Sequence, residues 1–196
     1  MKKHYLLLTF LLCLTATACG SSQRAQEDTA VTLADISSDH RVCSDAVYWE
    51  FSYEELQEKA DVIARVQVLD ELSSANSYTK SDENGLIASF CSARQVQPLE
   101  IYKNTIGLDE DQPFLVQEDA AIYLFNGEYF YDSLNDQTPL AKGDTYILYL
   151  QKQENALDNT LVIMSGENGT ISIDNPDENK AYSEIAEQTL DEYHIQ

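Results

Sequence analysis

Basic residues are scarce in this chain. Its 196 residues include 12 Lys and Arg against 34 Asp and Glu, which gives a formal net charge of −22. A field of that sign repels phosphate backbones, so the composition argues against nucleic-acid binding. Glycine and proline are also few, at 7 and 4. Hydrophobic residues make up 43%, so the chain can bury a core, and its length suits one domain.

Motifs for catalysis and metal binding are missing as well. The three histidines are His4, His40 and His194, and none is placed to orient a nucleophile or to complete a zinc site. A partial EF-hand pattern would put Lys80 and Cys91 where the obligatory carboxylates belong. We therefore predict no catalytic residue, no metal site and no cofactor, and favour a non-enzyme. A carboxylate-based enzyme stays open, because 34 acidic residues offer many pairs.

One apolar run stands near the N-terminus, where about ten residues (5–14) follow Lys2 and Lys3. Such a run is too short to span a bilayer and suits a signal peptide. Small residues then lead to Cys19, and this stretch resembles the lipobox of bacterial lipoprotein signals. The resemblance implies a signal peptide over 1–18, lipidation of Cys19 and an anchor in the cell membrane on its extracytoplasmic face, in a Gram-positive host by preference. An ordinary cleaved signal peptide is the alternative.

The polar composition after Cys19 predicts a disordered tether over 19–42, followed by a single domain over 43–196. A flexible coil of about 20 residues spans roughly 25 Å. That spacing would hold an acidic domain away from anionic headgroups. We expect the domain to be a monomer.

Local patterns predict the elements of that domain. Ser52 and Glu55 form a capping box that opens a short helix. Pro98 interrupts a long extended stretch and predicts a bulge or a sheet edge. Strands are expected over 61–69, 86–102, 114–117, 145–150, 161–164 and 170–173, a hairpin over 121–131, and helices over 52–59 and 181–193.

Three stretches, residues 60–63, 99–103 and 139–150, resemble a family of small surface lipoproteins from Gram-positive bacteria. The resemblance implies an OB-like or netrin-like layout and no agreed biochemical activity. Val66 and Asn104 replace glycines that the family often has. Together with the predicted strands, the resemblance favours a mainly β (α+β) domain: a small antiparallel β-barrel with one short N-terminal helix and one C-terminal helix.

Two cysteines remain after the signal and the lipidated position. An oxidising compartment favours a disulfide between Cys43 and Cys91, which would close a loop of about 50 residues. Two unrelated cysteines are the alternative.

The predicted hairpin is unusual because both of its faces are apolar. With Asn126 and Gly127 as its turn, the two-residue alternation puts Phe125, Tyr123 and Phe130 on one face. The other face carries Leu124, Tyr129, Ile122 and Tyr131. A hairpin on the rim of a barrel has only one face to bury. Either another segment covers the second face, or Tyr123, Phe125, Tyr129 and Tyr131 form a surface for a partner.

These observations favour a lipid-anchored binding or adaptor module whose partner is an extracellular protein or glycan. The alternatives are a netrin-like protease inhibitor and the carboxylate-based enzyme. Netrin-like inhibitors insert a free N-terminal cysteine, and a lipidated Cys19 would not serve in that way.

The substitution Cys19→Ser tests the anchor. We expect a fatty-acid analogue fed to cells to label the wild type alone, and the variant to leave the membrane or to stay unprocessed. Equal labelling of both proteins would contradict the assignment.

Overall fold

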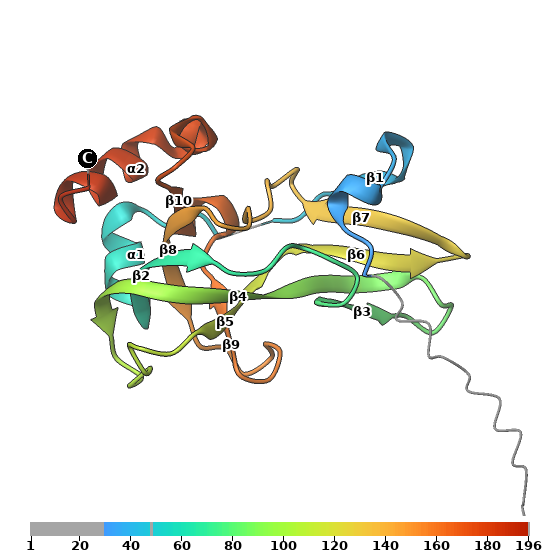
Figure 1. Ribbon diagram of the computed structural model, residues 1–196, viewed down its shortest axis with the longest axis horizontal. Coiled ribbons are helices and arrows are strands. Elements are labelled where there is room, and N and C mark those ends of the chain that lie inside the picture. Colours follow the sequence, from blue (N-terminus) through green and yellow to red (C-terminus); the bar gives the residue numbers. More distant parts are fainter. Residues whose placement is uncertain (1–29, 48, 196) are drawn as a thin grey trace, which may run out of the picture.

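The computed structural model describes residues 30–47 and 49–195 (Figure 1). Five strands close a barrel: β2 (Val62–Val68), β4 (Ile87–Asn104), β5 (Phe114–Glu118), β8 (Thr145–Gln151) and β9 (Thr160–Ile163). Their order around the barrel is β8-β2-β4-β5-β9, and β9 pairs again with β8. Among the five strand pairings of the barrel, only β5–β9 is parallel. This confirms the predicted mainly β, OB-like barrel.

The barrel core follows from the alternation along its strands. Val62, Val66 and Val68 of β2 point inward and are buried. The opposite parity is buried too, since Ile63 and Tyr149 pack beneath the helices. Strand β10 (Thr170–Ser172) extends the sheet beyond β8. Strand β8 is therefore covered on both sides, which explains its apolar run over 146–150, whereas β2 carries the half-buried Arg65 and the exposed Gln67 on its outer side.

Two helices cover the outside of β2 and β8. Helix α1 (Tyr53–Lys59) begins with the predicted capping box, in which Ser52 Oγ accepts the Glu55 amide and Glu55 accepts the Ser52 amide. Helix α2 (Ser183–Glu192) follows the 3₁₀ helix η4 (Pro176–Tyr182). The C-terminal helix thus begins two residues later than predicted. Its buried Thr189 hydroxyl lies 2.9 Å from the Tyr149 hydroxyl.

Strand β4 is long enough to serve two parts of the molecule. Its second half belongs to the barrel, and its first half pairs with β3 (Ser77–Ser81) beyond it. Opposite Arg65 and Val66 the register skips Leu99, so the bulge predicted at Pro98 is present beside that residue.

A second sheet lies along this extension. It has the order β1-β7-β6, from β1 (Arg41–Ser44), β7 (Glu128–Leu134) and β6 (Ala120–Phe125). Figure 1 shows the β6–β7 hairpin projecting away from the barrel above β3 and β4. The Ile122 amide donates to Ser77 Oγ at 2.9 Å, which ties the hairpin to β3.

The predicted tether is wrong from residue 30 onward. Residues 33–35 and 38–40 form the 3₁₀ helices η1 (Leu33–Asp35) and η2 (Ser38–His40), and Thr32 bridges to Ser73. Ile36 is only 5% exposed and packs in a cluster with Leu72, Ile122 and Tyr131. In the sequence, the few apolar residues of this segment stand among polar ones, so the composition resembles that of a tether. In the structure, these apolar residues face one cluster. Residues 19–29 lie outside the described residues.

The substitution Ile36→Ala tests whether this segment belongs to the fold. Because it empties a buried site, we expect it to lower the free energy of unfolding by about 2–5 kcal/mol in denaturant titrations. Leu86→Ala, at an exposed position, is the control and should change it by less than about 0.5 kcal/mol. Similar small effects for both would mean that residues 30–36 contribute little.

Candidate functional site: the aromatic hairpin and the buried cluster behind it

The hairpin has the predicted register. Phe125 pairs with Glu128, Leu124 with Tyr129, Tyr123 with Phe130 and Ile122 with Tyr131. Asn126 and Gly127 both have positive φ, +51° and +87°, as a type I′ turn requires. The local turn chemistry and the two-residue alternation therefore determine which residues share a face.

One face carries a row of half-buried aromatic rings. The Phe130 ring lies 6.4 Å from the Tyr123 ring and 6.3 Å from the Phe125 ring, centroid to centroid. His40 of η2 lies 4.6 Å from Phe130, and Phe90 of β4 lies 6.5 Å from Tyr123. These rings support one another, so Tyr123 and Phe125 belong to a packed row of half-buried residues.

Below the rings lies a buried carboxylate. Asp132 Oδ2 accepts hydrogen bonds from Ser44 Oγ at 3.1 Å and from the Tyr123 hydroxyl at 3.3 Å. Its other oxygen, Oδ1, is buried without a hydrogen-bond partner. Burial raises the pKa of Asp132. Burial and the neighbouring Asp132 raise the pKa of Tyr123 to about 12, so this hydroxyl stays protonated.

The opposite face divides along its length. Near the strand ends, Ile122 and Tyr131 are buried under the segment that contains Ile36. Near the turn, Leu124 is 58% exposed and Tyr129 is 37% exposed. The expectation that Tyr131 belongs to a partner surface is therefore wrong, because residues 31–36 cover it. Tyr129 remains a candidate for contact with a partner, and Leu124 is added to it as a second exposed residue.

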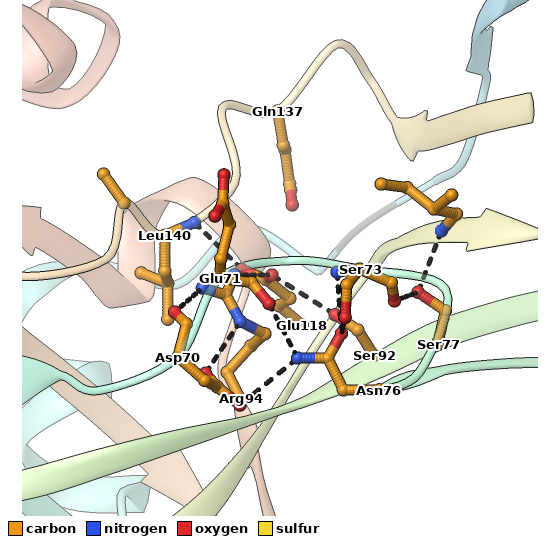
Figure 2. Close-up of polar contacts among 12 residues, drawn as sticks. Asp70, Glu71, Ser73, Asn76, Ser77, Ser92, Arg94, Glu118, Gln137 and Leu140 are labelled. Carbon is orange, nitrogen blue, oxygen red and sulfur yellow. Dashed lines mark hydrogen bonds and ion pairs between the residues drawn. The ribbon is translucent and has the colours of Figure 1, made fainter. Parts of the chain in front are cut away.

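A buried arginine lies between the barrel and the hairpin (Figure 2). Arg94 of β4 has no exposed side-chain surface. Its Nη1 donates to Glu118 Oε1 at 2.6 Å, and its Nε donates to Asp70 Oδ1 at 3.2 Å. Its Nη2 donates to the Asp70 carbonyl at 2.7 Å. Two carboxylates thus compensate the one buried charge.

The two carboxylates that pair with Arg94 also form hydrogen bonds to neighbouring segments. Glu118 also accepts the Ser92 hydroxyl and the Leu140 amide, at 3.2 and 3.0 Å, and so holds the loop that follows β7. Asp70 accepts the Asn76 amide group at 3.2 Å, and Asn76 in turn accepts the backbone N–H of Ser73. Figure 2 shows these bonds continuing to Ser77, which holds the hairpin through Ile122.

Sequence reasoning missed this cluster, although a signal was present. Arg94 shares strand parity with Val96, and Glu118 shares it with Val116, and both valines are buried. Opposite charges at inward positions of two adjacent strands indicate a buried ion pair. The third partner, Asp70, follows β2 and has no such parity, so only the fold places it beside Arg94.

The structure does not contain the predicted disulfide. Cys43 and Cys91 are both free, the first exposed and the second half-buried. Cys43 pairs with Ser133 in the β1-β7-β6 sheet, whereas Cys91 pairs with Tyr78 in the other sheet. The predicted disulfide is absent because Cys43 lies in β1, the edge strand of the β1-β7-β6 sheet, and Cys91 lies in the other sheet. Burial and the nearby Asp119 raise the pKa of the Cys91 thiol.

Comparison with known proteins gives no assignment, since no family model matches the chain and no curated protein is significantly similar to it. Within residues 30–47 and 49–195, no helix is both long and apolar enough to cross a membrane. The same part of the chain holds no group of three or more His, Cys, Asp or Glu residues arranged to bind a metal ion.

The substitution Arg94→Met tests the buried cluster. It leaves two acidic groups without their cation, so we expect a loss of about 3–5 kcal/mol in the free energy of unfolding. Arg65→Met is the matched control, because the Arg65–Glu100 pair is partly exposed and should contribute less than about 1 kcal/mol.

A second variant separates charge from packing. Adding Glu118→Gln to Arg94→Met removes one of the two unpaired charges and should recover part of the loss. Equal stability of the single and the double variant would show that the ion pair itself is unimportant.

Proposed function

We propose that this protein is a binding module, anchored to the extracytoplasmic face of the membrane through lipidated Cys19. In this proposal a partner protein contacts the tip of the β6–β7 hairpin. The observation that carries the proposal is the exposed cross-strand pair Leu124–Tyr129 on a structurally supported tip. A tyrosine beside an aliphatic side chain is typical of protein interfaces, because the ring adds contact area with little loss of rotamer freedom.

The support beneath the tip favours this use. Ile122 and Tyr131 anchor the strands in a buried cluster, while the Tyr123, Phe125 and Phe130 rings pack on the opposite face. Such a hairpin loses little conformational entropy when a partner binds it, and preorganisation of this kind increases affinity.

The negative charge of the chain limits the kind of partner that would bind to it. The chain carries a formal net charge of −22, and Glu128 beside Tyr129 is exposed. A basic partner would be drawn to this field and an acidic one repelled, mainly through the association rate. We therefore propose a partner protein with a basic rim around an apolar centre.

Photo-crosslinking in intact cells tests the proposal. A photoreactive amino acid at position 129 of the full chain should form a discrete crosslinked species, whereas the same group at exposed Glu154 should not. Identical products from both positions, or none from position 129, would count against a hairpin partner.

The substitutions Tyr129→Ala and Leu124→Ala separate binding from stability. We expect each substitution to abolish capture of the partner that crosslinking identifies. Each should change the melting temperature little, since both side chains are exposed. Tyr131→Ala should instead destabilise the protein by about 3–5 kcal/mol, because it empties a buried aromatic site. A large stability loss in Tyr129→Ala would indicate a structural role for the tip.

A further inference from the structure

Three Asn-Gly pairs occur in this chain: Asn84-Gly85, Asn126-Gly127 and Asn168-Gly169. Such a pair is chemically reactive for a local reason. Glycine has no Cβ, so its backbone nitrogen can approach the side-chain carbonyl carbon of the preceding asparagine closely. The nitrogen can then attack that carbon and displace the side-chain amide. The three pairs have the same two residues, so their surroundings in the fold decide how fast each one reacts.

The pair Asn126-Gly127 forms the turn of the β6–β7 hairpin, which projects away from the barrel (Figure 1). Both residues are exposed. Among the described residues, none forms a hydrogen bond with the Asn126 side chain or with the Gly127 N–H. The strand ladder ends at the Phe125–Glu128 pair, so a rotation at Asn126 breaks no strand pair. The carbon that is attacked and the nitrogen that attacks are therefore both open to water and free of hydrogen bonds.

The pair Asn84-Gly85 is also exposed, but hydrogen bonds restrain it. The Gly85 N–H, which would have to attack, donates to the Asp82 carbonyl at 3.1 Å. The Asn84 backbone N–H donates to Asp82 Oδ1 at 2.9 Å, and its side-chain nitrogen donates to Asp82 Oδ2 at 3.5 Å. These bonds must break before the nitrogen can reach the side-chain carbon, so we expect a slower reaction at this pair.

The pair Asn168-Gly169 is buried at the end of the 3₁₀ helix η3 (Gly166–Gly169). Asn168 is only 4% exposed, and its backbone N–H donates to the Ser165 carbonyl at 3.2 Å. The backbone of Gly169 packs so closely against Met164 that a Cβ at this position would collide with the Met164 carbonyl. The packing leaves this pair neither room to rotate nor access to water.

The reaction at Asn126 needs only water. The Gly127 nitrogen loses its proton to the solvent and forms a bond with Asn126 Cγ, and the side-chain nitrogen leaves as ammonia. Water then opens the resulting succinimide ring at either of its two carbonyls, which gives aspartate or isoaspartate. The overall change consumes one water and releases one ammonia, and no oxidant or reductant takes part.

Both products alter the hairpin tip. Each adds one negative charge beside Glu128, in a chain whose formal net charge is already −22. In isoaspartate the backbone also runs through the side-chain carbons and is one atom longer, so it cannot form the two-residue type I′ turn. Because the turn sets the register of a hairpin, the exposed cross-strand pair Leu124–Tyr129 would lose its arrangement.

We propose that Asn126 is a site of spontaneous modification, at which loss of the side-chain amide gives the hairpin tip a limited lifetime. The three pairs react in the order Asn126, Asn84, Asn168. The chemistry at Asn126 stands apart from the proposed partner, whereas the loss of partner binding rests on that proposed function.

Peptide mapping of the aged, full-length protein by mass spectrometry tests the order of reaction. The folded protein is kept in warm, mildly alkaline buffer and is then digested in acid, which prevents further reaction. We expect conversion, seen as a gain of one dalton, to be at least about fivefold faster at Asn126 than at Asn84, the factor that one hydrogen bond on the attacking group gives. The Asn168 peptide should stay unchanged. Conversion at Asn126 that is no faster than at Asn84 or at Asn168 would overturn the proposal.

The unfolded chain is the control for the effect of structure. In denaturant all three asparagines should convert at similar rates, because each precedes a glycine and none keeps its hydrogen bonds or burial. If Asn126 kept its advantage in the unfolded chain, the neighbouring sequence and not the exposed turn would be its cause, and the structural basis proposed here would be wrong.

The substitution Asn126→Gly separates the chemistry from the proposed partner. Glycine keeps the type I′ turn but has no side-chain amide, so the aged variant should gain no mass at this position. Crosslinking from position 129 should fall in the aged wild type as isoaspartate accumulates, and should persist in the aged variant. Conversion without any crosslinked partner in fresh protein would contradict the proposed function alone. Undiminished crosslinking in fully converted protein would show that the tip survives the modification, against the limited lifetime proposed.

Discussion

The Arg94 guanidinium is the constraint on which the arrangement of this protein depends. A fully buried cation must be paired, and here Asp70 and Glu118 approach it from different segments. Because Glu118 also holds the Leu140 amide, the same charge positions the loop between the hairpin and the barrel. Hydrogen bonds from Asp70 through Asn76 and Ser73 continue to Ser77, which supports β6.

Strand β7 begins beside Tyr129 at the hairpin tip, and the residue after it, Asn135, holds the segment after β1 through two hydrogen bonds with Ala46. The hairpin tip is supported from behind by packed rings and a buried cluster, while Leu124 and Tyr129 stay exposed. In a strongly acidic chain, this arrangement suits a basic partner at the tip.

Local rules predicted the parts of the fold that depend on neighbouring residues. The capping box at Ser52, the type I′ turn at Asn126-Gly127 and the bulge beside Pro98 each arise from short-range backbone geometry. Two predictions were wrong: the Cys43–Cys91 disulfide, and the described part (30–42) of the tether predicted over 19–42. Both depend on where distant strands lie, which local rules do not specify. Ile36 has polar neighbours in sequence, and its burial follows from Leu72 and Tyr131 far along the chain.

The sequence by itself therefore determined the fold class, the ends of the first helix and the pairing within the hairpin, because period, capping and turn chemistry are local. Only the tertiary structure decided which hairpin residues are exposed. Tyr129 and Tyr131 have the same parity, yet one is available and the other is buried under residues 31–36. It likewise placed Asp70 beside Arg94 and Glu118, since long-range packing brings the end of β2 next to two strands that lie far along the chain.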